Sequence, residues 1–387
     1  MVKASGVPPT PGVLQQTLRI AAIIPLCMGV IGCASSPKGV LAPVPAAVPG
    51  ASQVNLLVAT TRAPASDPAV LFSGERGQGL YTTEITLSIP RAANRQVGQV
   101  QWPKRLPPDP SNEFTTTKVR TLSDLGEVRG WLKQHLPRSR RVLVFVHGFN
   151  NRYEDAVYRF AQIVHDSHAD VAPILFTWPS RANVLEYAYD RESTNYSRTQ
   201  LEEVLRRAAQ DPSVGDVTIM AHSMGSWLVI EALRQMAIRD GRVAPKIRNV
   251  ILAAPDLDID VFRRQSQELG PSRPKLTLFL SQDDQALGVS RLIGGDVDRL
   301  GQINPAAEPY RSELEKAGVT VLDLTALKSG DPLNHSKFAE SPEVVRLLGE
   351  RLVAGQTISQ SRTGVSGQFG AVAAVTVGSA ASLFSLR

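Results

Sequence analysis

The sequence predicts an α/β protein built on one doubly wound, mostly parallel sheet, with antiparallel strands near the N-terminus. From Arg141 onward, short apolar runs alternate with amphipathic segments. Such alternation is typical of parallel strands that helices cover on both faces. The chain has 387 residues, of which 43% are hydrophobic and 20% charged, so it can form one large globular domain with a sizeable core.

Two strands are expected ahead of this core. Residues 54–58 and 83–89 have the composition of half-buried strands, and the second run alternates strictly between apolar and polar side chains. Gly- and Pro-rich breaks separate them, and residues 103–110 are expected to form a loop. The predicted domain spans residues 53–354, with a strand-rich part over 53–125 and the core over 141–354.

Six core strands are predicted, with helical segments between most of them. Leu201, Val204, Leu205 and Ala208 repeat at helical spacing, as expected for a helix that packs one face on a sheet. Right-handed crossovers in such a sheet place ligand sites at the carboxyl ends of the strands. The predicted strands are residues 142–146, 174–177, 217–220, 249–253, 276–280 and 319–324.

The N-terminal segment has the pattern of an export signal. Residues 20–31 are apolar and follow Arg19, a run too short for a comfortable membrane span but typical of a signal peptide. The text Val30-Ile31-Gly32-Cys33 resembles a bacterial lipoprotein box, which implies lipidation of Cys33. Ala34, not being aspartate, then favours the outer membrane, facing the periplasm. An ordinary signal or anchor helix with an incidental cysteine is the alternative.

These observations divide the ends of the chain from the domain. We expect a signal peptide over 1–32 and a flexible Pro- and Ala-rich tether over 33–52. Residues 355–387 form a low-complexity tail that could be disordered, touch a membrane or add strands.

Composition excludes several classes of protein. The formal net charge is +6, and no dense Lys/Arg run or basic stripe interleaved with aromatics appears, so nucleic acid is not an expected partner. Both cysteines, Cys27 and Cys33, lie near the N-terminus, which excludes a disulfide framework or cysteine metal site in the domain.

The most informative motif is Ala221-His222-Ser223-Met224-Gly225, between an apolar strand and a helical segment. It is nearly the G-x-S-x-G nucleophile elbow, in which a tight turn holds a serine in a strained conformation above the sheet. The positions two before and two after the serine must be small, because strand and helix nearly touch there. Ala221 takes the place of the first glycine.

A serine nucleophile needs a histidine base that an acid orients. In α/β hydrolases the chain order is serine, acid, histidine, and of six histidines only His335 follows Ser223. We therefore expect His335 to be the base; the alternative is a surface loop histidine. His147 and His222 are expected to be structural rather than catalytic, and no metal or organic cofactor is required.

The residue pattern alone does not decide which aspartate is the acid that orients His335. Asp283 and Asp284 follow the strand over 276–280, and only one of two adjacent loop residues can reach the imidazole. Asp256, Asp258 and Asp260 follow the preceding strand and could serve instead, although aspartates at such positions commonly cap helices.

The oxyanion hole requires backbone N–H groups aimed at the developing negative charge. Met224, directly after the nucleophile, should supply one of them. Phe149 in the loop His147-Gly148-Phe149 should supply the other, because Gly148 lets the backbone turn inward.

This set resembles the α/β-hydrolase superfamily and, more narrowly, a bacterial esterase/lipase-like group long described as a domain of unknown function. The resemblance covers roughly residues 54–350 and implies the fold and a triad but no substrate. In that group the acid precedes one residue and then Ala-Leu, which implies Asp284 rather than Asp283. The matching text is Val58-Ala59-Thr60-Thr61-Arg62, Phe145-Val146-His147-Gly148-Phe149-Asn150, Phe176-Thr177-Trp178-Pro179-Ser180, the Ser223 motif, Ala254-Pro255-Asp256 and Ser281-Gln282-Asp283-Asp284-Gln285-Ala286-Leu287.

The sequence therefore predicts a membrane-tethered serine esterase, with a small-molecule or lipid ester as substrate. Trp178, Tyr187 and Tyr189 are candidates to line an acyl pocket or to pack a lid. The same triad could transfer an acyl group to another acceptor or cleave amides. A non-catalytic envelope lipoprotein on the same scaffold is the other alternative.

Overall fold

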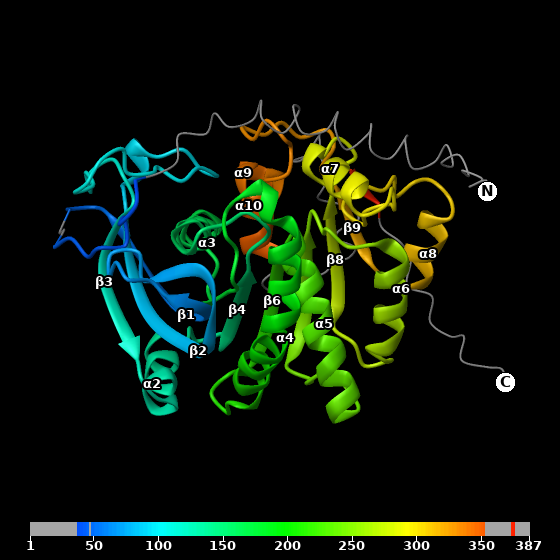
Figure 1. Ribbon diagram of the computed structural model, residues 1–387, viewed down its shortest axis with the longest axis horizontal. Coiled ribbons are helices and arrows are strands. Elements are labelled where there is room, and N and C mark those ends of the chain that lie inside the picture. Colours follow the sequence, from blue (N-terminus) through cyan, green and yellow to red (C-terminus); the bar gives the residue numbers. More distant parts are fainter. Residues whose placement is uncertain (1–36, 46–47, 353–372, 376–387) are drawn as a thin grey trace, which may run out of the picture. The chain divides into compact units, whose positions relative to one another are not determined.

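The computed structural model describes residues 37–45, 48–352 and 373–375. The chain divides into two units, residues 1–37 and 38–387, and apart from Pro37 everything described belongs to the second. The predicted signal peptide, Cys33 and most of the predicted tail lie outside the described residues. Among the described residues of the second unit, ten strands form one sheet, in the order β10-β9-β8-β7-β6-β4-β5-β1-β2-β3 (Figure 1).

The sheet has a parallel centre and antiparallel additions at both ends. Strand β1 pairs in parallel with β5, and parallel pairing continues through to β9. Strands β2 and β3 join antiparallel to β1, and β10 joins antiparallel to β9. The strands are β1 (Ser52–Pro64), β2 (Phe72–Ile89), β3 (Thr115–Leu122), β4 (Arg141–Val146), β5 (Ala172–Thr177), β6 (Asp216–His222), β7 (Ile247–Ala253), β8 (Lys275–Leu280), β9 (Thr320–Asp323) and β10 (Ala373–Val375).

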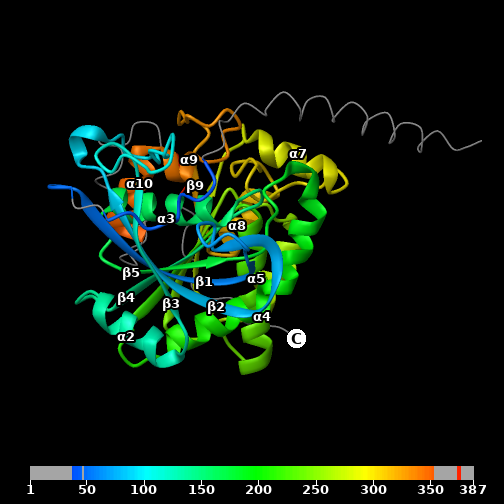
Figure 2. The same cartoon turned by 60° about the vertical axis from the view of Figure 1, so that its left-hand side comes forward.

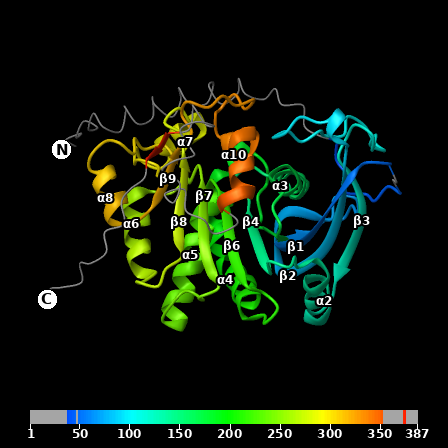
Figure 3. The same ribbon diagram turned by 180° about the vertical axis from the view of Figure 1, so that it is seen from behind.

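Helices cover both faces of this sheet (Figures 1 and 3). Helix α2 packs against β1 and β3, at the end of the sheet that comes forward in Figure 2. The helices are α2 (Leu125–His135), α3 (Tyr153–Ser167), α4 (Tyr187–Gln210), α5 (Met224–Asp240), α6 (Ile259–Glu268), α7 (Gln285–Ile293), α8 (Tyr310–Lys316), α9 (Lys337–Glu340) and α10 (Pro342–Leu347), with short turns η1 (Ala92–Asn94), η2 (Val184–Glu186) and η3 (Leu348–Leu352).

Two apolar cores result, one on each side of the sheet. In β4, Val142, Val144 and Val146 point into the core beneath α2, α4, α5 and α6. Leu143 and Phe145 alternate with them and enter the core beneath α3 and α10. This alternation follows from the two-residue period of a strand, and it explains why the parallel strands have continuous apolar sequences.

The predicted fold class is confirmed, and each of the six predicted core strands overlaps an observed one. Strand β3 and helix α2 were not predicted, because β3 has the mixed burial of an outer strand and α2 buries only Trp131 and Leu132. The predicted tether over 33–52 is too long. Val40 and Leu41 are fully buried against the α3 side of the sheet. Removing their aliphatic side chains from water stabilises the folded state, so this part of the chain packs on the domain.

Parallel pairing brings the loops that follow β4 to β9 to one edge of the sheet, the upper edge in Figure 1. The predicted catalytic and oxyanion residues are in these loops or adjacent to them: Ser223, Asp284, His335, Phe149 and Met224. Within the described residues, no helix has the length and hydrophobicity needed to cross a bilayer.

The turn from β6 into α5 depends on the absence of a side chain at Gly225. A Cβ at this position would lie 2.3 Å from the backbone oxygen of His147 and 2.8 Å from that of Val146, which is far closer than atoms pack. Strand β4 and helix α5 can approach this closely only because position 225 is glycine.

We therefore expect Gly225→Ala to lower the free energy of unfolding by about 1–3 kcal/mol or more, the usual cost of overpacking. Urea denaturation measures this loss. Gly130→Ala is the matched control, because a Cβ on this exposed α2 glycine would meet nothing within 4 Å. The control should gain about 0.4–1 kcal/mol. Equal stability of the two variants would contradict the packing argument.

Candidate active site

Ser223 occupies the turn between β6 and α5 in a strained conformation. Its φ is 51° and its ψ is −124°, values that a residue with a side chain rarely adopts. The backbone is fixed on both sides: the Ser223 N–H donates to the Ala253 oxygen at 2.9 Å, and the Ser223 oxygen accepts from the Asp256 N–H at 3.2 Å. The strained backbone is therefore held by the end of β7 and the loop that follows it.

His335 and Asp284 form a hydrogen-bonded pair at the same edge. Nδ1 of His335 lies 2.7 Å from Oδ2 of Asp284, whose side chain is fully buried. The other carboxylate oxygen of Asp284 accepts from the Leu287 N–H at 3.0 Å and so caps α7. With both oxygens engaged, the carboxylate has one orientation, and the imidazole is held with Nε2 turned away from it.

The loop that carries His335 is itself held by a carboxylate. Asp331 accepts from the backbone N–H groups of His335 at 2.8 Å and Ser336 at 2.9 Å. Burial disfavours the charged imidazole, but Asp284, Asp331 and Asp256 outweigh it and raise the pKa of His335 above 6.5. These carboxylates therefore favour a protonated His335.

The structure places Ser223 beside this pair without joining it. The His222 ring lies 4.6 Å from the His335 ring, which brings the end of β6 against the histidine loop. In the described chain, however, the Ser223 hydroxyl forms no hydrogen bond with His335. Such bonds are often long in the absence of substrate and tighten only when it binds.

The predicted oxyanion groups belong to residues next to the Ser223 turn: Met224 follows Ser223, and Phe149 follows Gly148, which approaches Ser223 closely. A Cβ at Gly148 would lie 2.8 Å from the Ser223 Cβ, so only glycine lets the loop after β4 come this close to the serine. Phe149 follows and packs its ring against Tyr187 at 5.3 Å. Among the described residues, the backbone N–H groups of Phe149 and Met224 donate to no other group. Both donors are therefore available to a ligand.

His147 is buried in a polar cluster beneath this loop. Its Nδ1 donates to the Gly148 oxygen at 2.8 Å, and its Nε2 accepts from the Trp178 N–H at 3.1 Å. Burial, reinforced by the nearby Arg62 charge, lowers the pKa of His147 to about 3. The imidazole therefore stays neutral and structural, as expected.

Arg62 ties the same loop to its neighbours, a role that the sequence did not reveal. The guanidinium is fully buried and donates to the backbone oxygens of Asn151 at 2.8 Å and Ser180 at 3.0 Å. It also lies 3.3 Å from Nε2 of His147. The available signal was its place at the end of the Val58-Ala59-Thr60-Thr61-Arg62 text, four residues after the predicted strand over 54–58.

The other candidate acids have different partners. Asp283 binds Lys337, and Asp258 caps α6. Asp260 pairs with Arg263 at the surface. Asp256 accepts from Tyr187 Oη at 2.9 Å and Ser290 Oγ at 2.6 Å. Of these five aspartates, only Asp284 hydrogen-bonds the imidazole.

The three aromatic residues that the sequence offers as walls of an acyl pocket lie in different surroundings. Trp178 is fully buried and stacks on His147 at 4.8 Å, so it packs the core and lines no acyl pocket. Tyr189 lies under the Arg181 guanidinium, 3.8 Å from its ring centre. Tyr187, which contacts Phe149 and bonds Asp256, is the one nearest the site.

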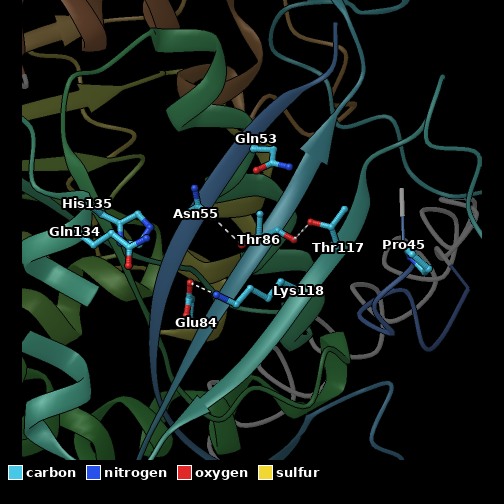
Figure 4. Close-up of a pocket in the computed structure, with 9 residues that line it drawn as sticks. All are labelled: Pro45, Gln53, Asn55, Glu84, Thr86, Thr117, Lys118, Gln134 and His135. Atoms are coloured by element: carbon cyan, nitrogen blue, oxygen red, sulfur yellow. Dashed lines mark hydrogen bonds and ion pairs between the residues drawn. The ribbon is translucent and has the colours of Figure 1, made fainter. Parts of the chain in front are cut away.

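A polar groove of about 650 Å³ lies away from this edge, on the outer surface of β1 to β3 (Figure 4). Its buried carboxylate, Glu84, is bonded to Lys118 at 2.8 Å and Arg120 at 2.9 Å. Glu84 is thus held in ion pairs with two cations. The residues that line the groove therefore offer no unpaired acid for a reaction. In the described chain, no group of three or more His, Cys, Asp or Glu side chains is arranged to hold a metal.

A comparison with protein families agrees with the observed fold. Residues 125–351 match the model of a family described as alpha/beta hydrolase of unknown function (DUF900). No curated protein matches the chain in sequence.

Solved structures with a related arrangement are distant. A predicted CIB-like hydrolase from Thermoplasma acidophilum is 13% identical, with a TM-score of 0.31 over 68% of this chain and 90% of that one. A putative cell surface hydrolase from Lactobacillus plantarum is 10% identical, with a TM-score of 0.34 over 60% and 98%. The siderophore hydrolase EstB from Aspergillus nidulans is 11% identical, with a TM-score of 0.32 over 80% and 97%. Similarities this distant carry no argument about substrate.

Proposed function

The chain belongs to the alpha/beta hydrolase family of unknown function, and on this premise we propose that it is a serine hydrolase that cleaves carboxylic esters through an acyl-enzyme. The hydrogen bond between His335 and buried Asp284, at the edge where Ser223 is held in its strained turn, is the observation that supports this most. A histidine oriented by a carboxylate beside such a serine is the arrangement that activates a hydroxyl.

In the proposed reaction, Ser223 Oγ attacks the ester carbonyl carbon while His335 Nε2 takes the hydroxyl proton. The backbone N–H groups of Phe149 and Met224 stabilise the oxyanion, and Asp284 stabilises the imidazolium. Collapse of the tetrahedral intermediate breaks the bond to the alcohol, which receives the proton from His335. Water activated by His335 then hydrolyses the acyl-enzyme and releases the acid.

A fluorophosphonate probe tests the nucleophile, because it reacts only with an activated serine. We expect it to label the wild-type chain at Ser223 and to leave Ser223→Ala unlabelled, as measured by intact-protein mass spectrometry. Ser226→Ala is the matched control, since Ser226 is a buried serine three residues further into α5. Folded wild type that resists the probe would favour a binding protein on a hydrolase scaffold.

The role of Asp284 predicts a change in pH dependence. His335 must be neutral to accept a proton, so the wild-type kcat/KM for a p-nitrophenyl ester should fall as the pH drops through a value above 6.5. Asp284→Asn removes the main group that raises the pKa of His335, so this acidic limb should move to lower pH. The same variant should lose about 10³- to 10⁴-fold in kcat.

Asp283→Asn serves as the comparison, with a smaller loss of about 100-fold or less, because Asp283 does not touch the imidazole. Equal losses in the two variants would contradict the assignment of the acid.

The cellular location is a separate proposal that rests on the sequence of residues 30–34. We expect Cys33→Ala to move the protein from the membrane to the soluble fraction of the cell envelope, because it removes the site of acylation. Fractionation followed by immunoblotting measures this, with Cys27→Ala as control. Membrane retention of the Cys33 variant would point to an anchor helix instead.

A further inference from the structure

Lys337 is a buried cation that the proposed reaction does not use. Its side chain is 2% exposed, and its ammonium lies 2.8 Å and 2.9 Å from the two carboxylate oxygens of Asp283. The ammonium also donates to Ser281 Oγ at 3.0 Å and to the Thr325 backbone oxygen at 3.0 Å. A buried ammonium is tolerated only when its donors are satisfied in this way.

These bonds connect the three chain segments that meet behind the proposed acid and base. Asp283 is adjacent to Asp284 in the loop after β8, and Thr325 follows β9. Lys337 begins α9, two residues after His335. The ammonium therefore lies where the loop of the acid, the end of β9 and the loop of the base converge.

We propose that Lys337, held by Asp283, is a positioning residue that sets the distance and orientation between Asp284 and His335. The inference rests on the proposed function for the statement that this hydrogen bond is catalytic. The mechanism is geometric: Asp284 and His335 are 51 positions apart in the chain, and the Asp283–Lys337 bond joins the neighbours of both. Small errors in such a geometry reduce the rate strongly.

Charge must be separated from geometry in the test, because Lys337 and Asp283 could also act on His335 through space. The groups that face the imidazole are Asp284 after β8, Asp256 after β7, Asp331 in its own loop and His222 at the end of β6. Removing only the cation favours the imidazolium, whereas removing only the anion disfavours it. Removing both leaves the net charge unchanged and deletes the bond.

The experiment is a histidine NMR titration of the full chain, with the His335 signal assigned from its loss in His335→Gln. We expect the double variant K337M/D283N to have a lower His335 pKa than wild type, because the Asp284 contact lengthens. Its kcat/KM should fall about 10- to 100-fold, mainly in kcat. The fold should tolerate the change, because methionine matches the length of lysine and both charges of the pair are removed together.

Two results would overturn the proposal. If the two single variants shift the His335 pKa in opposite directions and the double variant titrates like wild type, Lys337 acts only through charge. An unchanged kcat/KM in the folded double variant would also overturn it. Wild type that is inert to esters and fluorophosphonate would remove the proposed function, while the NMR titration would still report on the Asp284–His335 contact.

The variant E202Q/R206M is the matched control for general destabilisation. Glu202 is a buried carboxylate that pairs with Arg206 one turn away on α4, where neither contacts the Asp284 or His335 loops. This variant should lower the Tm and leave both the His335 pKa and kcat/KM unchanged. A shift of His335 in this control as large as in K337M/D283N would show that any loss of stability has the same effect.

Discussion

The tight contact between β4 and the start of α5 is the constraint on which the site depends. The helix can begin so close to the strand only because Gly225 has no side chain facing the His147 oxygen. The turn that makes this contact forces Ser223 into a positive φ. The cost of such a conformation is offset by parallel pairing of β6 on both sides. The same close packing of β4, β6 and α5 therefore both strains the Ser223 backbone and holds it in place.

Loops bring the other site residues, among them Asp284 and His335, to the Ser223 turn. Two buried cations, Arg62 and Lys337, hold these loops. Arg62 joins the loop after β4 to the loop after β5 through backbone oxygens. Lys337 joins the loops after β8 and β9 to the segment after His335. Each cation is buried and has fixed acceptors, so it specifies a geometry that apolar packing alone would leave loose. Neither cation belongs to the Ser223, Asp284 and His335 set, but each binds loops that carry or adjoin these residues.

The sequence predicts the parallel core well because its signals are local. A continuous apolar strand, the turn at Ser223 and the chain order of the groups can all be read without knowing which strands are neighbours. The extent of the tether could not be predicted, because Val40 and Leu41 are buried only through contact with a distant surface of the sheet. The partner of Lys337 could not be predicted either, since the pair is 54 positions apart and only the fold brings it together.

The two adjacent aspartates after β8 illustrate this difference. Residue types alone gave Asp283 and Asp284 equal claims to the imidazole, and only the resemblance to a known family favoured Asp284. The structure separates them by burial: Asp284 is fully enclosed and meets His335, whereas the side chain of Asp283 is 41% exposed and meets Lys337. Neighbouring residues of a loop point in different directions, so the two aspartates that follow β8 have different partners. The first aspartate fixes the loops, and the second is thereby presented to the histidine.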